Sequence, residues 1–179
     1  MKILGPLSRT VALAGLFSAA LFSAATVSGP ALAAKADIAL LQSYIGNWKG
    51  RGQLIGAESE TVVCRLNLTQ GNQDKVNYAG RCSLAGNALS VNGTLAYNEG
   101  AKRYEAAMTS NATFNGLAVG KKSGNGVVFN LRERGEDEEG NEMTITAQIA
   151  LNSGKINVEF NVVFNATGDQ LRASVPFSK

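Results

Sequence analysis

The two cysteines are the residues of this 179-residue chain best suited to covalent chemistry. Cys64 and Cys82 could form a disulfide, exchange electrons or bind a metal. They are too far apart to be a Cys-x-x-Cys redox motif, and the chain has no histidine and no third cysteine to complete a zinc site. The absence of histidine also removes His-dependent triads and His-ligated haem. We therefore expect a structural disulfide, with no metal and no cofactor.

The residues around the two cysteines favour a bridge between neighbouring strands. In residues 61–69 the apolar positions share the face of Cys64, and in residues 76–82 they share the face of Cys82. A turn at residues 71–74 centres this hairpin near residue 73, so the two cysteines should lie opposite each other on the apolar side. A bridge that closes this loop should contribute roughly 3 kcal/mol.

Other candidates for chemistry are weaker. The acidic run 136–139 lies between two glycines. Clustered carboxylates can bind Ca²⁺, but the spacing is not that of an EF-hand, and a solvated hairpin loop is the simpler interpretation. No serine or lysine spacing marks a nucleophile with its base. We therefore predict no catalytic residue and a non-enzymatic protein.

Residues 1–33 have the form of a secretory signal peptide. Lys2 and Arg9 precede an apolar stretch that ends in the small-x-small pattern Ala31-Leu32-Ala33. We expect cleavage after Ala33, which leaves one domain of residues 34–179 in the periplasm or outside the cell, without a membrane span. An uncleaved anchor is the alternative. Without the two basic residues of the signal the domain is nearly neutral, so we expect no nucleic-acid partner.

The mature chain begins with a predicted short helix and continues as short strands. Residues 36–45 place Ile38, Leu41 and Ile45 on one stripe, with Asp37 as the N-cap and Gly46 as the end of the helix. Alternating apolar residues between Gly- and Asn-rich turns then predict strands. We place them at 47–55, 60–69, 75–83, 88–97, 102–109, 113–120, 126–134, 141–151, 155–165 and 169–177.

The strand pattern predicts an all-β fold, an antiparallel up-and-down barrel of about ten strands with a short N-terminal helix. In the clearest hairpin, a two-residue turn at Ser153-Gly154 pairs Leu151 with Ile156 and keeps the apolar sets on one face. A barrel removes the exposed edges, whereas the alternative, an open two-sheet sandwich, keeps them.

The segment Gly46-Asn47-Trp48-Lys49-Gly50-Arg51-Gly52 resembles the calycin superfamily, and its extended glycine pattern is most similar to the nitrobindin-like group of small barrels. The resemblance implies that Trp48 closes one barrel end and packs under an Arg or Lys of the last strand, for which Arg172 is the candidate. It also implies an internal cavity for a small apolar ligand.

Seven large residues on the apolar face either fill a core or line such a cavity: Tyr78, Tyr97, Tyr104, Met108, Phe129, Phe160 and Phe164. Together these features predict an exported binding protein for a small hydrophobic or amphipathic ligand. The alternative is an envelope protein-interaction factor, such as a small-barrel protease inhibitor, which should show an exposed apolar patch on its loops.

Overall fold

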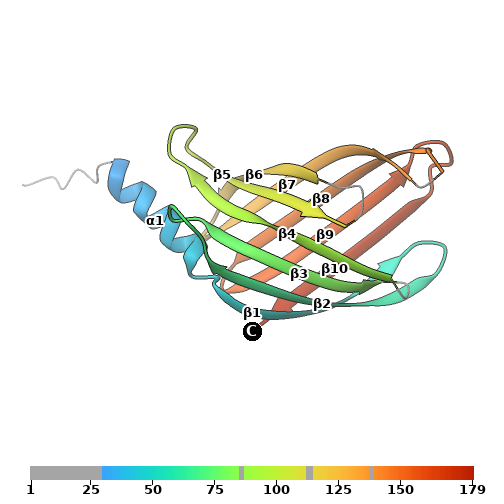
Figure 1. Ribbon diagram of the computed structural model, residues 1–179, viewed down its shortest axis with the longest axis horizontal. Helices are drawn as coiled ribbons and strands as arrows, with labels where there is room; N and C mark the ends of the chain where they lie inside the picture. Colours follow the sequence, from blue (N-terminus) through green and yellow to red (C-terminus); the bar gives the residue numbers. More distant parts are fainter. Residues whose placement is uncertain (1–29, 85–86, 112–114, 138) are drawn as a thin grey trace, which may run out of the picture.

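The computed structural model describes residues 30–84, 87–111, 115–137 and 139–179 (Figure 1). Most of the predicted signal peptide therefore lies outside the described residues. The described residues form one helix, α1 (Pro30–Gln42), followed by ten strands, each overlapping one predicted strand. These are β1 (Gly46–Ile55), β2 (Ser59–Gln70), β3 (Val76–Leu84), β4 (Asn87–Asn98), β5 (Arg103–Ser110), β6 (Asn115–Ser123), β7 (Gly126–Glu136), β8 (Glu142–Asn152), β9 (Lys155–Phe164) and β10 (Gln170–Ser178).

The ten strands close into an antiparallel barrel. Consecutive strands pair with each other, and β1 pairs with both β2 and β10. The closed ring decides in favour of the barrel over the open sandwich, since β1 and β10 both lose a free edge. Buried and exposed residues alternate along the strands, as in β2, so that one side chain in two faces the interior.

The barrel has two different ends. We call the end beside α1 the α1 end; it holds the turns from β2 to β3, β4 to β5, β6 to β7 and β8 to β9 (Figure 1). We call the opposite end the distal end; it holds the five remaining strand connections.

The helix differs from its prediction. It begins earlier and ends at Gln42, and Gly46 starts β1 with a φ of 140°, a conformation that favours glycine. Asp37 is not an N-cap, because it lies inside α1 with its side chain buried against the barrel. The fully buried residue of the expected stripe is Leu41, whereas Ile38 and Ile45 are half-buried. Tyr44, which the same helical spacing predicts as a widening of the stripe, is also buried. A buried helical stripe predicted from hydrophobicity alone does not include a buried carboxylate such as that of Asp37.

The predicted hairpin between β8 and β9 is confirmed. Leu151 pairs with Ile156, and Ser153 and Gly154 both have a positive φ, as a two-residue hairpin turn requires.

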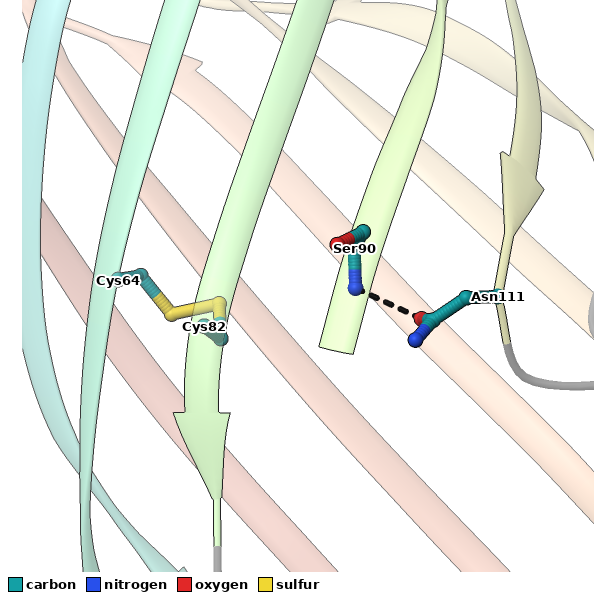
Figure 2. Close-up of a disulfide and its surroundings, with 4 residues drawn as sticks. All are labelled: Cys64, Cys82, Ser90 and Asn111. Carbon is teal, nitrogen blue, oxygen red and sulfur yellow. Dashed lines mark hydrogen bonds between the residues drawn. A yellow bond between two sulfur atoms is a disulfide. The ribbon is translucent and has the colours of Figure 1, made fainter. Parts of the chain in front are cut away.

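The predicted disulfide is also confirmed. Cys64 on β2 and Cys82 on β3 are register partners with Cα atoms 4.0 Å apart and a bond between their sulfurs (Figure 2). In the same view, the Asn111 side chain accepts a hydrogen bond from the Ser90 N–H at 2.7 Å. The Asn111 amide also donates to the Ala88 carbonyl at 2.9 Å, so this side chain continues the pairing with β4 just beyond the end of β5.

Candidate functional site

The barrel interior contains a cavity of about 270 Å³. Its wall comes from β2–β5 and β8–β10 and is nearly all aliphatic, aromatic or sulfur-containing, and both Cys64 and Cys82 belong to it. A cavity of this kind favours an apolar ligand, since it offers few partners for buried polar groups.

The cavity extends along much of the barrel axis, since its lining includes Leu68 and Leu151 toward the α1 end and Met108 and Met143 toward the distal end. At the α1 end, the inward residues Leu68, Val76 and Phe129 are almost completely buried. On the distal part of the walls, the inward residues Met108 and Met143 are only half-buried. Val62 and Ile145, which also lie toward the distal end, are 1% and 4% exposed, so Met108 and Met143 are the less tightly packed residues of this part of the wall.

The structure divides the seven predicted lining residues into two groups. Tyr78, Met108 and Phe160 line the cavity. The other four lie outside this lining: Tyr97, Tyr104, Phe129 and Phe164. Strand alternation gives the face of a side chain but not its depth along the barrel, so it could not separate the two groups.

The Tyr78 hydroxyl is the polar group in this apolar wall whose partner is clearest. It donates a hydrogen bond to the Ala107 carbonyl at 3.0 Å, which is possible because Gly93, beside it, has no side chain. Burial raises the pKa of Tyr78, so the phenol stays neutral. With its proton already bonded to the wall, Tyr78 presents mainly its ring to the cavity.

Trp48 closes the α1 end. Its side chain is 2% exposed, and its indole N–H donates to the Tyr44 carbonyl at 2.9 Å. The ring stacks on Tyr44 with centroids 6.1 Å apart. This contact joins the residues that follow α1 to the start of β1. Trp48 therefore lies at a barrel end, as the sequence predicted.

The predicted partner of Trp48 was wrong. Arg172 pairs with Ile55 toward the distal end of β10 and bonds to the Gln170 side chain. The cation over Trp48 is Lys179, whose Nζ lies 4.9 Å from the ring centroid and donates to the Ile45 carbonyl at 3.1 Å. The reason is register: β1 and β10 are antiparallel, so the start of β1 meets the end of β10.

A polar cluster beneath α1 was not predicted. The Asp37 carboxylate accepts hydrogen bonds from the Tyr104 hydroxyl at 2.6 Å and from Lys122 Nζ at 3.0 Å. Tyr97 and Phe129 pack against the Tyr104 ring. All three were predicted to line the cavity, but Tyr97 and Phe129 instead fix the position of the Tyr104 ring. This cluster joins α1 to β5 and β6.

Opposing effects act on the charge of this cluster. Burial acts to raise the pKa of Asp37, but the hydrogen bonds from Tyr104 and Lys122 and the charge of Lys122 outweigh it, so this pKa is lowered. Burial, followed by the bond to Asp37, raises the pKa of Tyr104. Asp37 is therefore a stable anion at neutral pH, with a neutral phenol as its donor.

We predict that Asp37→Ala lowers the free energy of unfolding at pH 7 by about 1–3 kcal/mol, because it leaves the buried Tyr104 hydroxyl without an acceptor. Asp37→Asn keeps an acceptor and should cost less. Since the folded-state pKa of Asp37 is lowered, its charge stabilises the fold above the unfolded pKa of about 3.9 and loses this effect as the pH falls through the folded value. Urea unfolding of wild type and D37N from pH 7 to pH 2.5 tests this. A constant difference across that range would contradict it.

The acidic loop between β7 and β8 bonds within itself. The Asp137 carboxylate accepts from the side-chain amide of Asn141 at 3.0 Å, and from the backbone N–H groups of Asn141 at 2.8 Å and Glu139 at 3.0 Å. These bonds, led by that of the Asn141 side chain, lower the pKa of Asp137. Within the described ranges, no group of three or more Cys, Asp or Glu side chains is arranged as a metal site.

Comparison with solved structures supports the barrel fold. Rv2717c from M. tuberculosis has a similar crystal structure, with a TM-score of 0.58 and 12% sequence identity over 79% of this chain and 97% of that one. The S-type phycobiliprotein lyase CPES from Guillardia theta is a more distant likeness, with a TM-score of 0.49 and 10% identity over 76% of this chain and 88% of that one. No protein family and no curated protein matches the sequence. The likeness to Rv2717c supports the fold that the strand pairing shows, a closed antiparallel barrel of ten strands of the calycin-like kind, and does not assign the chain to a family.

Two features bear on where the protein works. The Cys64–Cys82 bridge indicates an oxidising compartment. In the part of the chain that the structure describes, no helix has the length and apolar character needed to cross a bilayer.

Proposed function

We propose that this protein is an exported, non-catalytic binding protein that holds a small hydrophobic ligand in its barrel without a cofactor. The observation that carries the proposal is the apolar cavity of about 270 Å³ inside a barrel whose α1 end is closed by the buried Trp48. The disulfide supports the export part of the proposal, and the predicted signal peptide agrees with it.

The cavity limits the size of the ligand. It is about twice the roughly 150 Å³ of an engineered apolar cavity that binds benzene, and just below the roughly 300 Å³ at which drug-sized pockets begin. A ligand with an apolar part of roughly ten heavy atoms fits this range.

The exposed apolar side chains support the binding function over the protein-interaction alternative. Among the described residues that follow the predicted cleavage point, the large ones lie on β1, β2 and β6 rather than on loops: Ile55, Val63 and Leu117. Within the described residues, they do not form the loop patch that an inhibitor of this kind would need.

We predict that filling the cavity abolishes binding without unfolding the protein. Ala147 on β8 faces the cavity, and Ala150 on the same strand faces outward. Ala147→Phe should weaken binding of 1-aminonaphthalene, a probe of suitable size, by at least about tenfold because its ring occupies the ligand's volume. Ala150→Phe makes the same change on the other face and should leave the affinity within about twofold.

Fluorescence titration of the probe measures both variants, and far-ultraviolet circular dichroism checks that each is folded. Equal affinities for the two variants, or no binding by wild type, would contradict the proposed function. Organic extraction of protein purified from its own cells, followed by mass spectrometry, should recover a small apolar compound from wild type and A150F and not from A147F.

A further inference from the structure

The charges of the barrel are divided between its two ends. Eight described acidic residues lie at the distal end, in its loops or within three residues of a strand end: Glu58, Glu60, Glu133, Glu136, Asp137, Glu139, Glu142 and Asp169. The basic residues on the same parts of the strands are three outward-facing arginines, Arg81, Arg134 and Arg172. The distal end is therefore negative, whereas the buried Trp48 closes the opposite end of the barrel.

The α1 end has the opposite balance. Nine basic residues lie there: Lys35, Lys49, Lys75, Lys102, Arg103, Lys121, Lys122, Lys155 and Lys179. The acidic residues at this end are Asp37, Asp74, Glu99 and Glu105. Because the whole domain is nearly neutral, this separation gives the barrel a potential gradient along its axis, and a concave end lined by one sign of charge concentrates ions of the other sign.

Two of the distal carboxylates point into the barrel. Glu60 is the register partner of Leu54, which packs against the core, so Glu60 shares the inward face. Glu133 is the partner of Ile145, which is 4% exposed. The two glutamates come from β2 and β7, which are opposite each other in the strand order of the ring.

The position of Glu133 depends on a glycine. A Cβ on Gly116 would lie 3.3 Å from the Glu133 Oε1 atom, so the missing side chain leaves room for this carboxylate against the wall. Gly116 is in turn the register partner of Met108, which lines the cavity. Glu133 is not itself a lining residue, but its register partner Ile145 is, so Glu133 lies beside the distal part of the cavity wall.

Neither inward carboxylate is neutralised by the protein. Within the described ranges, no ion pair or hydrogen bond engages the Glu60 or Glu133 side chain, although both are half-buried. By strand alternation, the basic residue at an inward position on the described strands is Lys122, which is at the α1 end and bonds to Asp37. The cavity lining includes one further basic residue, Arg65, which occupies an exposed, outward position of β2. A half-buried charge without a partner loses hydration, and a cation placed beside it restores part of that loss.

We propose that the ligand is a cationic amphiphile, an apolar chain or ring system that carries an ammonium group. The apolar part occupies the cavity, and the ammonium group lies at the distal margin near Glu60 and Glu133. This inference rests on the proposed function, because it names the chemical class of the ligand for the same cavity. The negative distal end also attracts such a cation and repels fatty acids, the anionic amphiphiles of similar size.

Three probes with the same chain and different head groups test this class: octylammonium, 1-octanol and octanoate, each measured by displacement of 1-aminonaphthalene from the full mature protein. Octylammonium is expected to bind about tenfold more tightly than octanol, and octanoate more weakly than octanol, at low ionic strength. Added salt should reduce the difference between octylammonium and octanoate.

The variants separate this inference from the proposed function. Glu133→Gln and Glu60→Gln should each weaken octylammonium binding several-fold and leave octanol binding unchanged, which also shows that the cavity is intact. Glu142→Gln is the matched control, since it removes the same charge from an exposed, outward position at the same end. Equal binding of the three probes, or equal effects of E133Q, E60Q and E142Q, would overturn the cationic class and leave the binding function in place. Failure of all three probes to bind would overturn both.

Discussion

Trp48→Ala is expected to lower the free energy of unfolding by about 3–5 kcal/mol, the range for truncating a buried aromatic residue. The large cost arises because one side chain makes three kinds of contact at the α1 end. It fills the space beneath Tyr44, donates to the Tyr44 carbonyl and lies under the Lys179 ammonium. Urea unfolding followed by circular dichroism measures the change.

Trp48→Phe is the control for this prediction. It keeps an aromatic ring but removes the N–H, so it should lose only the buried hydrogen bond and part of the packing, roughly 1–2 kcal/mol. Lys179→Met should cost less still, because the ammonium group is exposed. A cost below about 1 kcal/mol for W48A would mean that the α1 end is not closed by this residue.

The second large effect is expected from removing the disulfide. Cys64→Ala together with Cys82→Ala should lower the free energy of unfolding by roughly 3 kcal/mol, because the open loop gains conformational entropy in the unfolded chain. The two strands remain paired on both sides of the bridge, so we expect the folded barrel to persist. Denaturant unfolding of the double variant measures this cost.

Reduced wild-type protein provides an independent check on the double variant. Its unfolding midpoint should agree with that of C64A/C82A, since both lack only the cross-link. If reduction lowered the midpoint and the double variant did not, the change would come from the reductant or the free thiols rather than from the cross-link. Unchanged midpoints for both would contradict the prediction.

The fold was predictable because its signals are local. Alternation of apolar and polar residues with a period of two identifies each strand, and the turn residues set the register of each hairpin, so the pairings of Cys64 with Cys82 and of Leu151 with Ile156 followed from the sequence. The Gly-x-Trp segment added the position of Trp48. Each of these inferences needs only neighbouring strands.

The candidate site was less predictable because it depends on contacts between distant strands. The pairing of β1 with β10, which closes the ring and which we call the seam, places Lys179 rather than Arg172 over Trp48. Asp37 had the residue type of a helix cap, and only the position of α1 on the barrel shows its bond to Tyr104. The inward position of Glu133 follows from alternation on β7, but its distance from the cavity depends on the depth of β7 in the closed ring.

The seam between β1 and β10 also determines when the barrel can form. The other pairings join strands that are consecutive in the chain, whereas the seam brings together Gly50 and Phe177, so its loop-closure entropy is the largest and we expect it to form last. A chain that crosses a membrane N-terminus first delivers β1–β3 early and β10 at the end of translocation. During that interval the edge of β1 is unpaired and able to join a strand of another chain. If the protein is exported, as we propose, the time needed to deliver the final strand sets how long each molecule is open to aggregation.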